Sequence, residues 1–380
     1  REPIPRHRAP AMCSPVCRSV LLLVASAAVH LGRCAAPACP GNSTAEDMMA
    51  GRDLRGTVAV VTGGDSGLGY AAAAALARHG ATVVMGNHNQ TRGEQAAKRI
   101  SEATGSTVQA LPLDLGSLKS VRGFARAFVQ GFGGKLHLLV NNAGIGGPSR
   151  LTRDGFETVF QVDYLGHFLL TELLLPALRA GAPSRVVNVA SGAHENACEA
   201  AGWRQDCFKD WTYLPPPVVP PRNVTVHYRT STVTAKASSY GIAKFANVQH
   251  AAALARRERG NGVQAFSLTP GFALTSMTSG VDPKDPKVRA FCEQQVHPDP
   301  SLPANPCPFS AEQGAAAIAV CATGDSKTLH SGAYYSRTFA CERRPVVMQG
   351  FTEDMQMELY ERSLRWAGLR AEAEPETLVV

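Results

Sequence analysis

The stretch Tyr240-Gly-Ile-Ala-Lys244 places a phenol and an ammonium four residues apart. On a helix, positions i and i+4 lie on one face, so the two side chains are expected to be neighbours. A nearby cation favours the phenolate form of a tyrosine, which suits the pair to exchanging a proton with a substrate oxygen. Ser191, earlier in the chain, could donate a hydrogen bond to the same oxygen. Such a pair by itself is more often an ordinary helix face, so the interpretation depends on the rest of the chain.

A glycine-rich turn offers a second kind of chemistry. The apolar run 58–61 leads through Thr62 into a turn with Gly63, Gly67 and Gly69, and an alanine-rich helical pattern follows. Backbone N–H groups at a helix N-terminus bind anions, and glycines let a pyrophosphate approach the backbone closely. The spacing differs from the usual G-x-G-x-x-G, so this turn alone leaves open both a dinucleotide site and an ordinary strand–helix turn.

Strand and helix patterns alternate along most of the chain. Short apolar runs predict strands at 58–62, 81–85, 108–113, 136–140, 185–189, 263–268 and 332–335. Helical patterns lie at 70–79, 91–103, from 117 onwards, and at 155–179, 239–259, 311–322 and 351–366. This alternation predicts an α/β fold, a single Rossmann-type domain with a doubly wound parallel sheet of about seven strands and helices on both faces.

The composition agrees with a compact enzyme. The chain has 380 residues, of which 44% are hydrophobic and only 18% charged, as in a packed globular domain. The formal net charge of +7 is mild and the basic residues gather partly near the start, so a nucleic-acid-binding protein is not expected. No spacing of cysteines and histidines resembles a zinc site, so no metal is predicted.

Polar residues follow the predicted strands where each strand ends. They are Thr62, Asp114, Asn141, Ser191 and Thr275. Because parallel sheets bind ligands outside the carboxyl ends of their strands, these side chains predict the position of the site. Two proline-rich segments interrupt the pattern. Residues 276–308 are predicted to form a lid, and residues 195–235 are left open between a lid and a peripheral excursion.

Five motifs occur in an order that resembles the short-chain dehydrogenase/reductase family. They are Thr62-Gly63-x-x-x-Gly67-x-Gly69, Asn141-Asn142-Ala143-Gly144, Ser191, Tyr240-x-x-x-Lys244 and Pro270-Gly271, within residues 55–335. Residues 152–156 and 164–171 further resemble the branch that contains the retinol dehydrogenases and the WW-domain oxidoreductase. The resemblance implies hydride transfer between a nicotinamide dinucleotide and a carbonyl or alcohol group.

The resemblance also implies roles for single residues. Tyr240 would exchange the proton, Lys244 would assist it and hold the nicotinamide ribose, and Ser191 would orient the substrate oxygen. The fourth catalytic residue of the family is an asparagine, but this chain has Asp163, so its role in a proton relay is left open. Besides Tyr240 and Lys244, the implied dinucleotide contacts are Thr62, Gly63, Gly67, Leu68, Gly69, Asn87, His88, Asp114, Leu115, Asn141, Ala143, Gly144, Pro270, Gly271 and Thr275.

The segment after the second predicted strand bears on the choice of dinucleotide. A carboxylate there would bind the ribose diol of NAD and repel the 2′-phosphate of NADP. The chain has Asn87 at that place, and His88 and Arg92 could pair with a phosphate, whereas Asp65 adds a negative charge. The balance favours NADP(H) over NAD(H).

The resulting interpretation is an NADP(H)-dependent oxidoreductase for a small lipophilic substrate, by resemblance a retinoid, steroid or polyprenoid. The alternative is a dinucleotide-binding or scaffold protein with weak or no catalysis, which Asp163 and the long 195–235 insert would support. No nucleic-acid partner is expected, and a homodimer is left open.

Residues 1–40 are interpreted as a leader. A basic start, an apolar run at 20–31 and small residues near Ala36 resemble a secretory signal, with Met12 as a candidate start. The secretory pathway, either the ER lumen or the outside of the cell, is favoured. A plastid enzyme, or an ER-anchored one held at the membrane by an uncleaved leader, are the alternatives. The domain then spans 41–345, and a C-terminal helix and tail span 346–380.

Apart from Cys13 and Cys17, the cysteines lie mostly as close neighbours in sequence. They are Cys34/Cys39, Cys198/Cys207, Cys292/Cys307 and Cys321/Cys341. Local disulfides would form easily in a secreted protein, but connectivity cannot be deduced from sequence. Reduced structural thiols are the alternative.

Overall fold

The computed structural model describes residues 39, 41–147, 150–194, 223–227, 232–236, 239–279, 281–293, 307–344 and 352–370. Outside these ranges lie the predicted leader except Cys39, the greater part of the 195–235 insert and residues 294–306, and with them Cys34, Cys198 and Cys207. Within the described ranges, no helix combines the length and the apolar character needed to cross a bilayer.

An eight-stranded sheet organises the domain, in the order β10-β9-β8-β5-β4-β1-β2-β3. All neighbouring strands pair in parallel except β10, which runs antiparallel to β9 at one edge. The strands are β1 (Val58–Thr62), β2 (Thr82–Asn87), β3 (Val108–Pro112), β4 (Leu138–Asn141), β5 (Ser184–Val189), β8 (Val263–Thr269), β9 (Tyr334–Ser336) and β10 (Glu342–Arg344). The predicted α/β fold with a parallel sheet is confirmed, and β10 is a strand that the sequence did not predict.

The order of the strands reverses at the centre of the sheet. From β1 the chain moves outward through β2 to β3, and it then returns to β4 on the other side of β1. The connections that follow β1 and β4 therefore lead in opposite directions. Sheets of this kind bind ligands at such a switch point.

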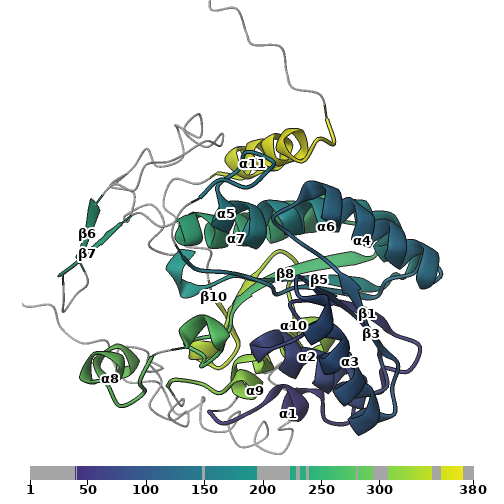
Figure 1. Ribbon diagram of the computed structural model, residues 1–380, viewed down its shortest axis with the longest axis horizontal. Coiled ribbons are helices and arrows are strands. Elements are labelled where there is room, and N and C mark those ends of the chain that lie inside the picture. The colour runs from purple at the N-terminus through teal and green to yellow at the C-terminus, as the bar shows by residue number, and fades with distance from the viewer. Residues whose placement is uncertain are drawn as a thin grey trace, which may run out of the picture. The chain divides into compact units, whose positions relative to one another are not determined.

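Helices cover both faces of the sheet, as Figure 1 shows. One face carries α1 (Ala45–Met49), α2 (Gly67–Arg78), α3 (Gln90–Thr104), α9 (Ala311–Gly314) and α10 (Ala316–Thr323). The other carries α4 (Leu118–Gly131), α5 (Thr158–Phe160), α6 (Gly166–Ala180), α7 (Ser239–Arg257) and, over these, α11 (Glu353–Trp366). Alternate residues of β1 supply both cores, since Val61 belongs to the core under the first group and Val60 to the core under the second.

The long helix predicted over 155–179 is interrupted near the middle. α5 passes into a π-helical segment, η2 (Gln161–Leu165), and α6 follows. The π geometry frees the carbonyl group of Asp163, which accepts hydrogen bonds from His167 Nδ1 at 3.2 Å and Asn247 Nδ2 at 3.0 Å. Single π turns of this kind occur frequently at functional sites.

Three segments that we expected to be irregular contain regular structure. The short helix α1 lies in a polar stretch for which no helix was predicted, although the Thr44–Asp47 capping box was a readable helix-start signal. The hairpin of β6 (Asn223–His227) and β7 (Thr232–Lys236) lies in the 195–235 insert, and its alternation of valine with polar residues is typical of strands. Helix α8 (Pro286–Glu293) lies in the predicted lid.

The predicted C-terminal helix is present as α11 and packs against α7 and α6. Its Leu359 and Tyr360 side chains are buried. The Tyr360 hydroxyl donates to Glu172 of α6, and the guanidinium of Arg257 on α7 lies 4.2 Å from the centre of the Tyr360 ring. The tail of the domain is thus held by polar as well as apolar contacts.

Among the described cysteines, two pairs lie at disulfide-bonding distance, Cys39 with Cys341 and Cys292 with Cys307. The second pair are the sequence neighbours that we grouped together, but the first are separated by 302 positions. Cys321, which we grouped with Cys341, is instead a buried free thiol on α10. Spacing could not predict the long-range pair because the two residues meet only through the tertiary fold.

Candidate active site

The turn after β1 brings the backbone close to any ligand above it. Gly63 and Gly67 have φ values of +66° and +54°, which favour glycine. A Cβ at Gly69 would lie 2.2 Å from the Gly63 carbonyl oxygen, so no larger residue fits there. The N-cap residue of α2, Ser66, makes no capping hydrogen bond through its side chain. The first N–H groups of α2 are therefore suited to bind an anion such as a pyrophosphate.

Thr62 ties this turn to the turn after β4. Its Oγ1 accepts the backbone N–H groups of Asn142 and Ala143 at 2.9 and 3.0 Å, and Asn142 Nδ2 donates to the Thr62 carbonyl at 2.9 Å. With two bonds accepted, the Thr62 hydroxyl proton points to His167 Nε2 at 2.8 Å, which is nearer than the Val140 carbonyl at 3.4 Å.

His167 carries this network to the π-helical segment. Because its Nε2 accepts the Thr62 hydroxyl, its own proton lies on Nδ1, which faces the Asp163 carbonyl at 3.2 Å. The ring is buried, and burial lowers the pKa of His167 to about 3. A neutral histidine thus links the glycine turn to the backbone of Asp163.

Tyr240 and Lys244 lie on the first turns of α7, as their spacing predicts. The Lys244 side chain is only 3% exposed, and its Nζ donates to the Val189 carbonyl at the end of β5 at 3.2 Å. The same Nζ lies 3.1 Å from Asp163 Oδ2 and 5.3 Å from the centre of the Tyr240 ring. Lys244 therefore joins α7, β5 and η2 at one point.

Asp163 is fully buried and forms an ion pair with Lys244 where the family resemblance implies an asparagine. Its Oδ1 accepts the Ile145 N–H at 2.8 Å, and a Cβ at Gly144 would lie 2.9 Å from its Oδ2. Burial raises the pKa of the Asp163 carboxyl, against the opposing effect of the Lys244 ammonium. Burial alone would lower the pKa of Lys244, but the charge of the adjacent Asp163 carboxylate and its hydrogen bond with the ammonium help to outweigh burial, and the pKa of Lys244 is raised. Lys244 is therefore a cation at neutral pH.

Ser191 follows β5, two residues after the carbonyl that binds Lys244. Its Oγ accepts the Ala193 N–H at 3.2 Å, which leaves the hydroxyl proton to be donated elsewhere. The four predicted catalytic residues thus lie at the carboxyl end of the sheet, on segments that meet around Lys244.

The remaining predicted contacts lie at the same end of the sheet. They are Asp114 and Leu115 after β3, Asn141, Ala143 and Gly144 at the end of β4, and Pro270, Gly271 and Thr275 after β8. A Cβ at Gly67 would lie 3.3 Å from the Thr275 side chain, so the loop after β8 lies over the glycine turn. A Cβ at Gly314 of α9 would lie 2.6 Å from Leu68 Cδ2. Asp114 Oδ1 accepts the Gly116 N–H at 2.9 Å, so one hydrogen-bond acceptor site of this carboxylate is already used within its own turn.

The residues predicted to select the dinucleotide differ in accessibility. Asn87 is 1% exposed, and a Cβ at Gly93 would lie 2.5 Å from its Nδ2. Neither amide atom of Asn87 has a hydrogen-bond partner in the described part of the chain, and the side chain is not open to a ligand in this arrangement. His88 is exposed, and Arg92 forms an ion pair with Asp65 at 2.8 Å.

Sequence reasoning missed the buried polar network behind the site. Asn141 was predicted as a dinucleotide contact, but it is buried and its Nδ2 donates to Thr171 Oγ1 and Asn188 Oδ1 at 3.0 and 2.9 Å, so its side chain connects β4 to α6 and β5. His167, Thr171 and Asn188 were not predicted. The available signal was the presence of His167, Thr171 and Asn188 inside apolar patterns, since buried polar groups need hydrogen-bond partners.

The sequence of this chain is similar to a known protein family and to several characterised proteins. A model of the family described as short chain dehydrogenase matches residues 57–202. The WW domain-containing oxidoreductase of Danio rerio is 34% identical over 315 residues, which cover 80% of this chain and 68% of that protein. Retinol dehydrogenase 12 of Mus musculus is 37% identical over 231 residues, which cover 59% of this chain and 64% of that protein.

A solved active-site complex of Pseudomonas aeruginosa RhlG with NADP is also similar. It shares 26% identity and a TM-score of 0.53, and the match covers 75% of this chain and 95% of that one. Among the curated relatives, the matched stretches span from 37% to 68% of the relative's own length.

Proposed function

This chain belongs to the short-chain dehydrogenase/reductase family, in the branch of the retinol dehydrogenases, and on that premise we propose that it transfers hydride between a nicotinamide dinucleotide and a carbonyl or alcohol group of a lipophilic substrate. The observation that carries the proposal is the position of Lys244. Its contacts join the Tyr240 helix, the strand that ends before Ser191 and the buried Asp163.

The residues around Lys244 have separate roles in the transfer of one proton. In the reductive direction, Tyr240 Oη gives its proton to the substrate oxygen, and in oxidation it takes the proton back. The Lys244 cation favours the phenolate that remains on Tyr240 after the transfer. Ser191 donates a hydrogen bond to the substrate oxygen and holds it within reach of Tyr240. When bound, the dinucleotide supplies or accepts the hydride.

The glycine turn fits a dinucleotide, because its left-handed glycines and the uncapped start of α2 leave room and N–H groups for a pyrophosphate. We favour NADP(H) because no carboxylate follows β2 and the exposed His88 lies there. RhlG supports this choice, since its solved complex contains NADP. A 2′-phosphate would have to compete with Asp65 for Arg92.

Exposed apolar side chains support a lipophilic substrate. The exposed large hydrophobic residues in the described ranges are Ile145, Leu151, Leu274, Met277, Phe291 and Val129. All except Val129 lie in segments that follow β4 or β8, whose carboxyl ends border the site. Exposed apolar side chains in segments that border the site are suited to contact an apolar ligand.

A matched pair of substitutions tests the substrate class. Met277 and Val129 are similarly exposed, at 47% and 44%, but only Met277 lies in the loop after β8. With NADPH, Met277→Ser should lower kcat/KM for a long-chain aldehyde by about tenfold. A short polar aldehyde should be turned over as by the wild type, and Val129→Ser should change neither value. Equal losses on both aldehydes, or no loss in Met277→Ser, would contradict a lipophilic substrate bound at this loop.

A further inference from the structure

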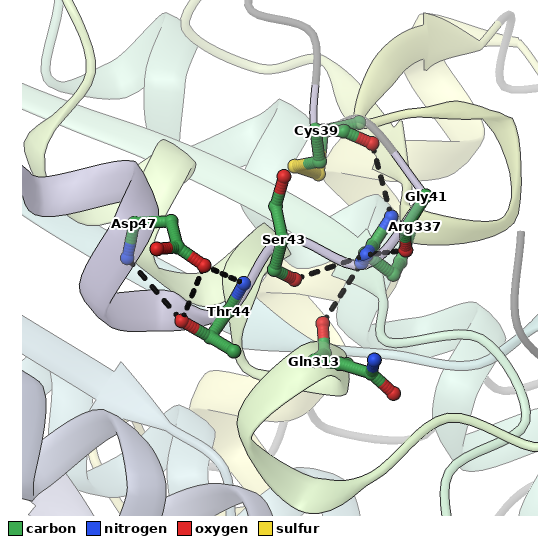
Figure 2. The surroundings of a disulfide bond; sticks show 8 residues. Cys39, Gly41, Ser43, Thr44, Asp47, Gln313 and Arg337 are labelled. Atoms are coloured by element: carbon green, nitrogen blue, oxygen red, sulfur yellow. Dashed lines mark hydrogen bonds between the residues drawn. A yellow bond between two sulfur atoms is a disulfide. The ribbon is translucent and has the colours of Figure 1, made fainter. Parts of the chain in front are cut away.

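A buried guanidinium lies behind the dinucleotide site, in a part of the chain that carries no family motif. Arg337 is 0% exposed, and no carboxylate pairs with it among the described residues. Its nitrogen atoms donate to four backbone carbonyls, those of Gln313 at 2.8 Å, Cys39 at 3.1 Å, Gly41 at 2.7 Å and Ser43 at 3.1 Å. Figure 2 shows these carbonyl groups gathered around the guanidinium. Burial lowers its pKa to about 10, so it is charged at neutral pH.

Three of these carbonyls belong to residues 39 and 41–43, which we call the N-terminal strap. Cys39 lies at disulfide-bonding distance from Cys341, and its N–H donates to the Ala340 carbonyl at 2.7 Å. Ala340 and Cys341 have φ values of +52° and +59°, a left-handed conformation that is costly for residues other than glycine. A turn in this conformation persists only where the surrounding contacts hold it, so the strap and the turn hold each other.

The guanidinium also contacts the loop that follows β8. Its Cζ lies 4.6 Å from the centre of the Phe309 ring. A Cβ at Gly271 would lie 2.5 Å from that ring, so Phe309 packs directly on the Pro270–Gly271 turn. Backbone bonds continue this contact, since Phe309 N–H donates to the Phe272 carbonyl at 2.7 Å and Leu274 N–H to the Phe309 carbonyl at 2.8 Å.

A second set of contacts connects Arg337 to the dinucleotide site through α9. Gln313, whose carbonyl binds Arg337, precedes Gly314. A Cβ at Gly314 would lie 2.6 Å from Leu68 in the glycine turn and 3.0 Å from Ala273 in the loop after β8. The contact through Phe309 therefore ends on the loop after β8, and the contact through α9 ends on both that loop and the glycine turn, the two segments between which the dinucleotide is expected to bind.

We propose that Arg337 is a positioning residue of the dinucleotide site, which holds the 270–275 loop and α9 against the glycine turn while the strap, closed at Cys39 and Cys341, supplies most of its hydrogen-bond acceptors. The inference rests on the proposed function only for the identity of the ligand. The contacts themselves do not depend on it.

The test compares the wild type with Arg337→Met, Arg337→Lys and Cys341→Ser in the full chain. Arg78→Met is the matched control, because Arg78 pairs with Glu46 of α1 on the surface and contacts neither the loop nor Phe309 in the described interactions. Dissociation constants for NADPH and NADH are measured by fluorescence titration. Amide hydrogen exchange is followed in residues 270–279 and, as an internal reference, in α11.

Arg337→Met is expected to weaken NADPH binding by about tenfold, with a smaller change in kcat, as for other couplings between a distant residue and a ligand. Arg337→Lys keeps the charge but cannot reach four carbonyls, and it should recover part of the loss. Cys341→Ser should change binding in the same direction, which keeps the test valid if Arg337→Met does not fold. Exchange should become faster in residues 270–279 and stay unchanged in α11.

Wild-type affinity together with wild-type exchange in 270–279, in a folded Arg337→Met or Cys341→Ser protein, would overturn the inference. A wild type that binds neither dinucleotide would instead count against the proposed function. In that case the exchange measurement still decides the inference, since it needs no ligand.

Discussion

At the scale of single residues, the site depends on the buried Lys244 ammonium and on the Asp163 carboxylate that neutralises its charge. The helical spacing of Tyr240 and Lys244 was readable from the sequence because it needs only local geometry. The ion-pair partner of Lys244 was harder to predict from the sequence, because Asp163 lies in the π-helical segment η2, far from Lys244 in the chain. The carboxylate supplies a counter-charge inside the protein, which the asparagine implied by the family resemblance could not. His167 escaped prediction because its role depends on two hydrogen bonds to distant segments.

Asp163→Asn removes the negative charge of this residue and keeps nearly the same side-chain shape, so it tests the effect of the charge alone. The amide can still accept the Ile145 N–H, but Lys244 loses its buried counter-charge. The free energy of unfolding should fall by about 3 kcal/mol, because a buried charge is left without its partner. The uncompensated ammonium should favour the phenolate more strongly and move the pH profile of alcohol oxidation to lower pH. The measurement is kcat/KM against pH together with urea unfolding.

The exposed Asp325 provides the control for this change, and Asp325→Asn should leave both the profile and the stability as in the wild type. If the profile of Asp163→Asn coincided with that of the wild type, the charge of Asp163 would have no influence on the acid–base step.

His250 makes the stability of the domain sensitive to acid. Burial lowers its pKa to about 3, from an ordinary value of 6.5. Between these values the unfolded chain binds a proton that the folded chain does not, so the stability is present above pH 6.5 and is lost as the pH falls towards 3. The loss from one such group is about 2 kcal/mol at pH 5. His250→Phe, which keeps a ring among Phe168 and Tyr360, should therefore lose about 2 kcal/mol less than the wild type between pH 7 and pH 5.

Denaturant unfolding at both pH values measures this difference, with the exposed His330→Phe as control. Equal losses in the wild type and in His250→Phe would show that the buried ring is not a source of the acid sensitivity.

At the scale of elements, the strands and helices that build the site follow local patterns. Val58–Thr62 and the alanine-rich helix after it were predictable because apolar periodicity and glycine spacing are local properties of the chain. The π segment was not, since its i→i+5 geometry is stabilised by side chains from elsewhere, such as Asn247. The hairpin β6–β7 was missed because its alternation is short and directly follows a proline-rich stretch.

Two glycine-to-alanine substitutions test the turn as an element. Gly69→Ala places a Cβ against the Gly63 carbonyl and should displace the turn, which should weaken NADPH binding by about a hundredfold. Gly123 of α4 has open space around a Cβ and no left-handed φ, so Gly123→Ala should leave binding unchanged. It should also stabilise the domain by about 0.5–1 kcal/mol, because the unfolded chain loses freedom.

Titration with NADPH and thermal unfolding of both variants provide the comparison. A Gly69→Ala protein with wild-type affinity would mean that the turn does not contact the dinucleotide.

At the scale of the whole molecule, the fold class could be predicted and the long-range closures could not. Alternation of strands and helices is repeated often enough to define a doubly wound sheet. The contact of Cys39 with Cys341, by contrast, depends on where the first and last parts of the domain meet, which no local pattern encodes. The same holds for α11, whose existence was predictable but whose position over α6 and α7 depends on Tyr360 reaching Glu172.

The most direct test of the proposed mechanism replaces Tyr240, whose phenol is assigned as the general acid and base. The wild type and Tyr240→Phe are given NADPH and a long-chain aldehyde, and the loss of nicotinamide absorbance is followed while NADPH affinity is measured separately. Tyr240→Phe is expected to lose about 100- to 10,000-fold in kcat and to bind NADPH as the wild type does. Turnover by Tyr240→Phe within tenfold of the wild type would contradict the assignment of Tyr240 as the proton-transferring residue.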